Sequence, residues 1–191
     1  MRREPPLVIA HRGASGYRPE NTLSAFQLAV DQRADMVEMD LHLSRDDAIV
    51  IRHDEDLASL GLKREIRAAD LAQIQSLDVG DGEKIPTLNE VLDRFGSEIA
   101  FNLEIKTGSD GAYPGFEAAV LRAVEGRGLL SSTLFSSFCD GVLGRLRALS
   151  SEARLAVLVS ARRPGGALER ARAVGAEALN PWFGLANTPW V

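Results

Sequence analysis

Short apolar segments alternate with amphipathic helical segments along almost the whole chain. Six of the apolar segments have the length and composition of strands: residues 7–10, 36–43, 99–106, 133–138, 155–159 and 178–183. A short extended segment, residues 49–52, follows the second of them. This strand–helix alternation favours a parallel sheet with helices packed outside it.

Helix-start signals support these boundaries. Asn21 or Thr22 can cap a helix over residues 23–30, and the capping role is expected of Asn21. Thr87 and Glu90 have the spacing of a capping box at the start of another helix. Pro114 is expected to open a helix that runs to about residue 127.

The predicted fold is α/β, a TIM-type (β/α) barrel. A closed barrel has eight strands, whereas about six βα units are present, so the barrel is predicted to be incomplete at its C-terminal side. We expect one domain over residues 1–191, with an insertion at about 54–86 that covers the mouth of the barrel. Strands at an open edge expose backbone groups and apolar faces. This predicts either a longer protein or a homo-oligomer that covers the open edge.

Composition and charge exclude several classes of function. The chain has 22 Lys and Arg against 27 Asp and Glu, which gives a net charge of -5. An acidic chain without a run of basic residues is not expected to bind nucleic acid or an anionic membrane surface. Cys139 is the only cysteine, which excludes an intramolecular disulfide and a thiolate metal cluster. The N-terminal segment lacks the features of a signal peptide, and no apolar run approaches a membrane span. The expected location is the cytoplasm, without stable membrane association.

Glu38 and Asp40 lie two residues apart in a predicted strand, so their side chains share one face. Two such carboxylates make a site of hard oxygen ligands that suits Mg²⁺ or Ca²⁺. The alternative is an amphipathic strand with a solvated acidic face. The parallel sheet argues against it, because such strands are covered on both sides and unpaired buried carboxylates are costly.

Glu104 and Lys106 share one face of the third predicted strand in the same way. They could form a simple ion pair. In a barrel, however, catalytic groups collect at the C-terminal ends of strands. Glu104 could therefore complete the metal site, and Lys106 could meet the phosphate charge of a substrate.

His11 and His53 each follow an apolar strand, and two such histidines can serve as base and acid across one scissile bond. His42 is interpreted as a residue at the rim. Arg12 offers a planar fork for phosphate oxygens, and its alternative role is a salt bridge with Glu20 or Asp40.

These residues lie in runs that resemble the glycerophosphodiester phosphodiesterase family of the bacterial cytoplasmic type. VIAHRGASGYRPENTLSAFQLAV and ADMVEMDLHLSRDDAIVIRHDEDL are the most specific runs, since His-Arg-Gly, Pro-Glu-Asn-Thr, Glu-x-Asp and His-Asp occur together at family-like spacing. IPTLNEVLDRF and FNLEIK follow in the family's order, and LFSSF and RLAVLVS are weaker matches. Two features depart from the family. Ala58-Ser59-Leu60 stands where the family has an Arg-Thr pair, and the later Trp-Thr-Val-Asn block and the closing Asp-containing strand are absent.

The resemblance implies a TIM barrel that hydrolyses glycerophosphodiesters to an alcohol and glycerol 3-phosphate. By this resemblance His11 and His53 are the general acid–base pair, and Arg12 and Lys106 bind phosphate. The resemblance also implies that one divalent cation, Mg²⁺ or Ca²⁺, is bound by Glu38, Asp40 and Glu104. It further implies that Glu20 is an acid that contacts the functional residues rather than the substrate or the ion.

Two other functions compete with this one. A related diesterase that cleaves lysophospholipids would need an apolar entrance for the acyl chain. A truncated, non-catalytic barrel that only binds phosphate would follow from the missing strands, although all the chemical residues are present.

Overall fold

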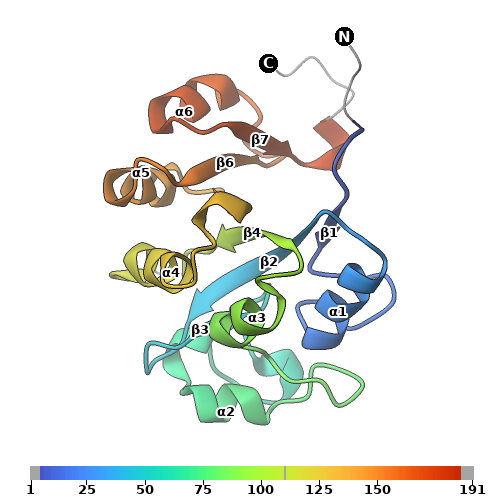
Figure 1. Cartoon of the computed structure of the whole chain (residues 1–191). Helices are drawn as coiled ribbons and strands as arrows, with labels where there is room; N and C mark the ends of the chain where they lie inside the picture. Colours follow the sequence, from blue (N-terminus) through green and yellow to red (C-terminus); the bar gives the residue numbers. More distant parts are fainter. Residues whose placement is uncertain (1–4, 110, 186–191) are drawn as a thin grey trace. The chain divides into compact units, whose positions relative to one another are not determined.

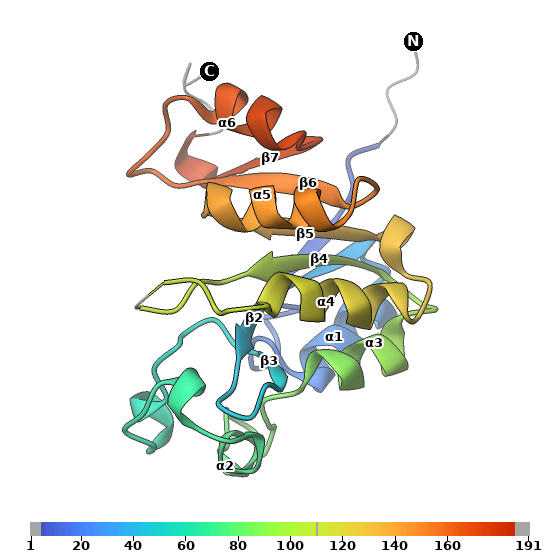
Figure 2. The ribbon, with the colours of Figure 1, turned by 90° about the vertical axis from the view of Figure 1, so that its left-hand side faces the viewer.

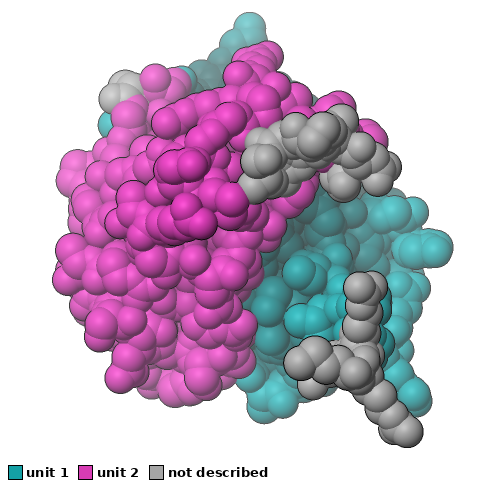
Figure 3. Space-filling model, turned by 90° about the horizontal axis from the view of Figure 1, so that it is seen from above, with its two compact units in different colours: residues 1–102 teal, residues 103–191 magenta. Residues whose placement is uncertain are grey.

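The computed structural model of the chain describes residues 5–109 and 111–185. It contains two compact units, residues 1–102 and residues 103–191 (Figure 3). Figure 1 labels the helices and strands along the chain. Strand β4 (Ala100–Ile105) contains the division between them. The prediction of a single barrel domain stays a prediction.

The first unit is built on a parallel strand pair. Strand β1 (Ile9–His11) pairs in parallel with β2 (Met36–Leu43), and helix α1 (Leu23–Asp31) makes the crossover that a parallel pair requires. Strand β3 (Ile49–Ile51) then returns antiparallel to the end of β2. Every residue of β2 is buried, including its two acidic residues, so the expectation of a covered strand is confirmed.

Helix α3 (Leu88–Phe95) completes this unit. Thr87 and Glu90 form the predicted capping box, because each side chain accepts a hydrogen bond from the other residue's backbone N–H. The apolar face of α3 packs inward, and the ring of Phe95 meets that of Phe26 edge to face at a centroid distance of 6.4 Å.

The segment predicted as an insertion, residues 54–86, packs around a buried cluster that it shares with β3. It holds two short 3₁₀ turns, η1 (Ala58–Leu60) and η2 (Ile66–Ala68), and helix α2 (Leu71–Ser76). This cluster combines Val50 of β3 with five residues of the segment, Leu57, Ile66, Ala69, Ile74 and Ile85. That it covers the mouth of a barrel stays a prediction.

The second unit repeats the strand–helix pattern. Strands β5 (Thr133–Ser137), β6 (Arg154–Val159) and β7 (Ala178–Pro181) form consecutive parallel pairs. Helices α4 (Phe116–Glu125), α5 (Asp140–Leu149) and α6 (Ala167–Val174) alternate with them along the chain. Figure 2 shows α5 running alongside β5 and β6. Two 3₁₀ turns, η3 (Leu130–Ser132) and η4 (Phe183–Leu185), precede β5 and follow β7.

The strands and helices match the sequence expectations with small shifts. All six predicted strands are present, and the seventh described strand, β3, is the short extended segment. Helix α4 begins at Phe116 rather than at Pro114, because Gly115 at its N-cap has a left-handed backbone that ends the preceding turn. Among the described residues, no helix is both long and apolar enough to cross a lipid bilayer.

Candidate active site

The end of β1 is held against β2 by its backbone. In the strand register His11 stands opposite Glu38, and the N–H of Arg12 donates to Glu38 Oε2 at 3.0 Å. Gly13 follows with φ +77°, and a Cβ there would lie 2.8 Å from the carbonyl carbon of Ala25. Only glycine fits this turn, which explains the Gly of the His-Arg-Gly motif.

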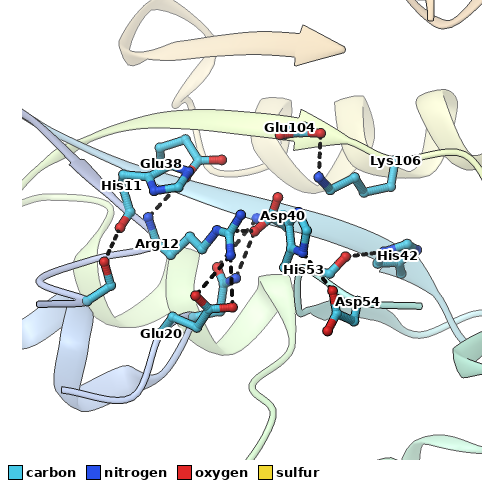
Figure 4. Close-up of polar contacts among 12 residues, drawn as sticks. His11, Arg12, Glu20, Glu38, Asp40, His42, His53, Asp54, Glu104 and Lys106 are labelled. Carbon is cyan, nitrogen blue, oxygen red and sulfur yellow. Dashed lines mark hydrogen bonds and ion pairs between the residues drawn. The ribbon is translucent and has the colours of Figure 1, made fainter. Parts of the chain in front are cut away.

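The guanidinium of Arg12 is held by two acids. Its Nη1 donates to both carboxylate oxygens of Glu20, at 3.0 and 2.9 Å, and its Nε lies 3.3 Å from Asp40 Oδ2 (Figure 4). Both salt bridges that the sequence left as alternatives are therefore formed. They orient the guanidinium plane beside the carboxyl group of Asp40.

Asn21 has a different role from the one the sequence suggested. Thr22 caps α1, accepting a hydrogen bond from the N–H of Ala25 at 3.2 Å, so the prediction of Asn21 as the cap is wrong. The Asn21 side chain instead donates from Nδ2 to Asp40 Oδ2 at 2.8 Å, and its Oδ1 accepts from the Asp40 N–H at 3.4 Å. Its backbone has φ 59°, which turns the side chain toward β2.

The two acids of β2 are almost completely enclosed, Glu38 being 6% exposed and Asp40 0%. Ionised carboxylates at this depth need hydrogen bonds or cations to offset the loss of water. Asp40 accepts a hydrogen bond from the Asn21 side chain and forms an ion pair with Arg12. Glu38 accepts a hydrogen bond from the Arg12 N–H, and the Nε2 of His11 lies 3.8 Å from Glu38 Oε2.

The pKa of His11 is lowered from its ordinary value. Partial desolvation is the largest cause, and the positive charge of Arg12 is the next. A lowered pKa favours the neutral imidazole near pH 7, which is the form that accepts a proton.

His53 follows β3, and two neighbours fix it. Its Nδ1 lies 2.8 Å from Asp54 Oδ1, and its carbonyl oxygen lies 3.2 Å from the Nε2 of His42. The hydrogen bond with His53 is the main cause that lowers the pKa of Asp54. The N–H of Arg52 donates to the carbonyl of Asp40 at 3.0 Å, which ties this segment to β2.

His42 is not a rim residue, and that prediction is wrong. Its exposed fraction is 2%, because β3 covers the end of β2 and sets Val50 opposite it. Sequence reasoning also missed Asp54, although its place next to His53 in the His-Asp run was a signal.

In the second unit, Glu104 and Lys106 form the ion pair that the strand pattern allowed, with Lys106 Nζ 2.5 Å from Glu104 Oε1. Both side chains line a cavity of about 290 Å³, together with Ile105, Thr107, Ser137, Phe138 and Cys139. Ser137 Oγ donates to the Ile105 carbonyl at 2.8 Å and so joins β5 to β4 beneath this cavity.

A second cavity of the same unit, about 450 Å³, lies beside the first and shares Phe138 with it. Its other lining residues are Ser160, Ala161, Arg162 and Trp182. The rings of Phe138 and Trp182 are half exposed. The cavity is therefore mainly apolar, in contrast to the charged one.

The chemistry of the acidic residues fits a divalent cation. Glu38 and Asp40 in the first unit and Glu104 in the second are buried, and each offers a carboxylate oxygen as a ligand. Mg²⁺ and Ca²⁺ prefer such hard oxygen ligands.

Parallel strands that alternate with helices, with histidines and acids at the strand ends, define this chain as an α/β protein with a polar candidate site. The family model of the glycerophosphoryl diester phosphodiesterase family matches residues 11–189. The chain belongs to this family.

Relatives agree with this assignment. The chain is 36% identical over 141 residues to a glycerophosphodiester phosphodiesterase of Bacillus subtilis (strain 168), covering 65% of this chain and 47% of the relative. It is 35% identical over 162 residues to one of Caldanaerobacter subterraneus subsp. tengcongensis, covering 80% of this chain and 66% of the relative. The chain thus spans about half to two thirds of the length of these two relatives.

Solved structures show the same fold. A phosphodiesterase of Oleispira antarctica in complex with the product sn-glycerol-3-phosphate is similar with a TM-score of 0.81 and 34% identity, covering 92% of this chain and 74% of that chain. A glycerophosphodiester phosphodiesterase of Thermotoga maritima is similar with a TM-score of 0.76 and 29% identity, covering 94% and 75%. The predicted TIM-type fold and the family resemblance are confirmed.

Proposed function

We propose that this chain hydrolyses glycerophosphodiesters to an alcohol and glycerol 3-phosphate in a reaction that needs a divalent cation. The observation that carries the proposal is the network at the ends of β1 and β2, where Arg12 joins Glu20, Glu38 and Asp40 beside His11. Membership of the family supports it, and so does the product found in the Oleispira antarctica relative.

Glu38, Asp40 and Glu104 are proposed to bind one cation, Mg²⁺ or Ca²⁺. Bound there, such an ion would polarise the phosphate oxygens and stabilise charge that develops at phosphorus. Lys106 and Arg12 are proposed to hold the remaining phosphate charge. Glu20 keeps the Arg12 guanidinium in its orientation through two hydrogen bonds.

His11 and His53 are proposed to act as general base and general acid. The lowered pKa of His11 suits the base, because the neutral ring can take a proton. Asp54 holds Nδ1 of His53, which leaves Nε2 to exchange a proton with the substrate.

The test is release of glycerol 3-phosphate from glycerophosphocholine by the purified chain. We expect turnover with added Mg²⁺ or Ca²⁺, none after treatment with EDTA, and recovery when the ion is restored. Glu38→Gln should abolish the metal-dependent turnover and leave the circular dichroism spectrum unchanged. A chain that binds glycerol 3-phosphate but never releases it from a diester would be the non-catalytic phosphate-binding barrel instead.

The apolar cavity favours one second candidate, cleavage of lysophospholipids. Phe138 and Trp182 could accept an acyl chain whose phosphate lies near Lys106, because the two cavities share Phe138. Comparing kcat/KM for lysophosphatidylcholine and glycerophosphocholine separates the candidates. If the lysophospholipid is preferred, Trp182→Ala should lower its kcat/KM and leave that of glycerophosphocholine unchanged.

A further inference from the structure

The loop between β1 and α1 contains a polar side chain that none of the proposed roles uses. We propose that Asn21 is a positioning residue that fixes the carboxyl group of Asp40 and thereby sets the affinity for the divalent cation. This inference rests on the proposed cation site and goes beyond it, because Asn21 is not itself offered as a ligand.

The side chain of Asn21 contacts Asp40 with both of its polar atoms. Nδ2 donates to Asp40 Oδ2 at 2.8 Å, while Oδ1 accepts from the Asp40 N–H at 3.4 Å. An amide side chain has a donor nitrogen and an acceptor oxygen, so it can donate to a carboxylate and accept from the same residue's N–H at once. Asn21 is 4% exposed, so water cannot easily replace these bonds.

The contacts determine which oxygen of Asp40 is held by the loop. Asn21 Nδ2 and Arg12 Nε both approach Oδ2. With Oδ2 held, rotation of the carboxyl group is restricted, and Oδ1 is the oxygen proposed to meet the cation. A ligand fixed in advance loses less conformational freedom on binding, and groups that orient metal ligands typically contribute about 10- to 100-fold to metal affinity.

The backbone of Asn21 has a separate, purely structural role. Its N–H donates to the Arg12 carbonyl at 3.0 Å and closes the loop, a bond that any residue except proline retains. Its φ of 59° is unfavourable for most side chains but natural for glycine and tolerated by asparagine. Asn21→Gly therefore removes the amide without adding backbone strain, whereas Asn21→Ala removes the amide and adds strain.

The experiment measures Mg²⁺ and Ca²⁺ binding to the full chain by isothermal titration calorimetry, without substrate. We expect Asn21→Gly and Asn21→Ala to weaken binding by a similar factor, about 10- to 100-fold. Both variants should lower the melting temperature, because each removes the buried hydrogen bonds to Asp40. Asn21→Ala should lower it further, through strain at φ 59°. The control is Thr22→Ala, which removes the neighbouring helix cap and should lower the melting temperature while leaving the metal affinity unchanged.

Two results would overturn the inference in distinguishable ways. If Asn21→Gly binds the cation as tightly as the parent chain, Asn21 does not position Asp40, and the cation site itself still stands. If the folded parent chain binds neither ion, the proposed site fails and this role of Asn21 fails with it. A loss of affinity in Thr22→Ala equal to that in Asn21→Gly would mean that general loosening of the loop, not the amide, sets the affinity.

Discussion

Arg12 and Asn21 both have positive φ angles, 58° and 59°, within one short loop. Such a conformation costs free energy in residues other than glycine and persists only where the surroundings enforce it. Here the N–H of Asn21 binds the Arg12 carbonyl, and both side chains turn toward Asp40. The strain is therefore located where the loop delivers polar groups to β2.

The two histidines at strand ends should differ from the buried one in their effect on catalysis. His11→Ala and His53→Ala should each lower kcat by about 10²-fold or more, since each removes a proton-transfer group. His42→Ala should lower kcat less, because its Nε2 contacts the His53 carbonyl and no proton transfer to the substrate is assigned to it. Steady-state kinetics on glycerophosphocholine with saturating metal ion checks this order. Equal losses at all three positions would contradict the assignment.

Single residues show where sequence reasoning succeeded and where it did not. Glu38 and Asp40 could be placed on one buried face because strand periodicity and the covering of parallel strands are local rules. Asn21 was misassigned because it and Thr22 are both good N-caps, and only tertiary contact with Asp40 distinguishes them. His42 was misplaced because the antiparallel return of β3 over the end of β2 is not visible in the spacing.

In the turn from β1 into α1, Gly13 has no space for a side chain. Gly13→Ala should destabilise the protein by about 1–3 kcal/mol, because a Cβ at φ +77° is strained and would lie 2.8 Å from the Ala25 backbone. Gly16→Ala is the matched control from the same loop. Nothing lies within 4 Å of a Cβ at Gly16, so we expect a change within about 0.5 kcal/mol. Urea unfolding of the three proteins measures both changes, and a Gly13→Ala protein as stable as the control would refute the tight turn.

Asp46 joins the β2–β3 turn to the start of α2. Its Oδ1 accepts from Ser44 Oγ at 2.7 Å and from the Leu71 N–H at 3.0 Å. The Ser44 bond is the main cause that lowers the pKa of Asp46 below its ordinary 3.8. A lowered pKa in the folded state means that the ionised form stabilises the fold above the unfolded-state pKa, and that this stabilisation is lost as the pH falls through the folded-state pKa.

This pH dependence of the stability can be tested with an isosteric variant of Asp46. Asp46→Asn keeps an acceptor oxygen and lacks the charge, so it should be less stable than the parent chain near neutral pH. The difference should shrink as urea unfolding is repeated from about pH 6 down to pH 3. Because Asp46 is exposed, the effect is small. A difference that stayed constant with pH would mean that the charge of Asp46 contributes nothing.

Most elements could be predicted because their signals are local. The alternation Val37, Met39, Leu41 fixed β2 over the same residues as the structure shows, and the Thr87 capping box fixed the start of α3. Element ends were less certain. Helix α4 starts two residues later than Pro114 suggested, because the left-handed backbone of Gly115 intervenes.

At the scale of the whole molecule, β1 and the two residues before it leave apolar side chains in contact with solvent. Leu7, Val8 and Ile9 are 68%, 61% and 43% exposed, and Val8 lines a mainly apolar cavity of about 280 Å³ between β1 and α1. Clustered exposed apolar groups favour association. We therefore expect the chain to self-associate with rising concentration in light scattering after size exclusion, and Val8→Lys to reduce this. A strictly monomeric parent chain would contradict the prediction.

The proposed cation should stabilise the whole molecule if it binds the folded chain alone. At a free ion concentration of about 100 times Kd, the gain is about 2.7 kcal/mol, or a rise of about 5–10 °C in melting temperature for a chain of this size. Glu38 is assigned to one unit and Glu104 to the other, so a shared ion requires both of them for the full rise. We expect Glu38→Gln and Glu104→Gln each to remove most of the rise. Glu90→Gln, which changes an exposed acid of α3, should retain it.

Differential scanning calorimetry with and without Mg²⁺ or Ca²⁺ measures these shifts without any substrate. The melting temperatures without metal serve as the baseline, because removing a buried carboxylate also changes stability directly. If Glu38→Gln loses the rise and Glu104→Gln keeps it in full, the cation is held by the first unit alone. Glu104 would then be a partner of Lys106, 2.5 Å away, and not a ligand of the cation, and the assignment of three shared ligands would be wrong.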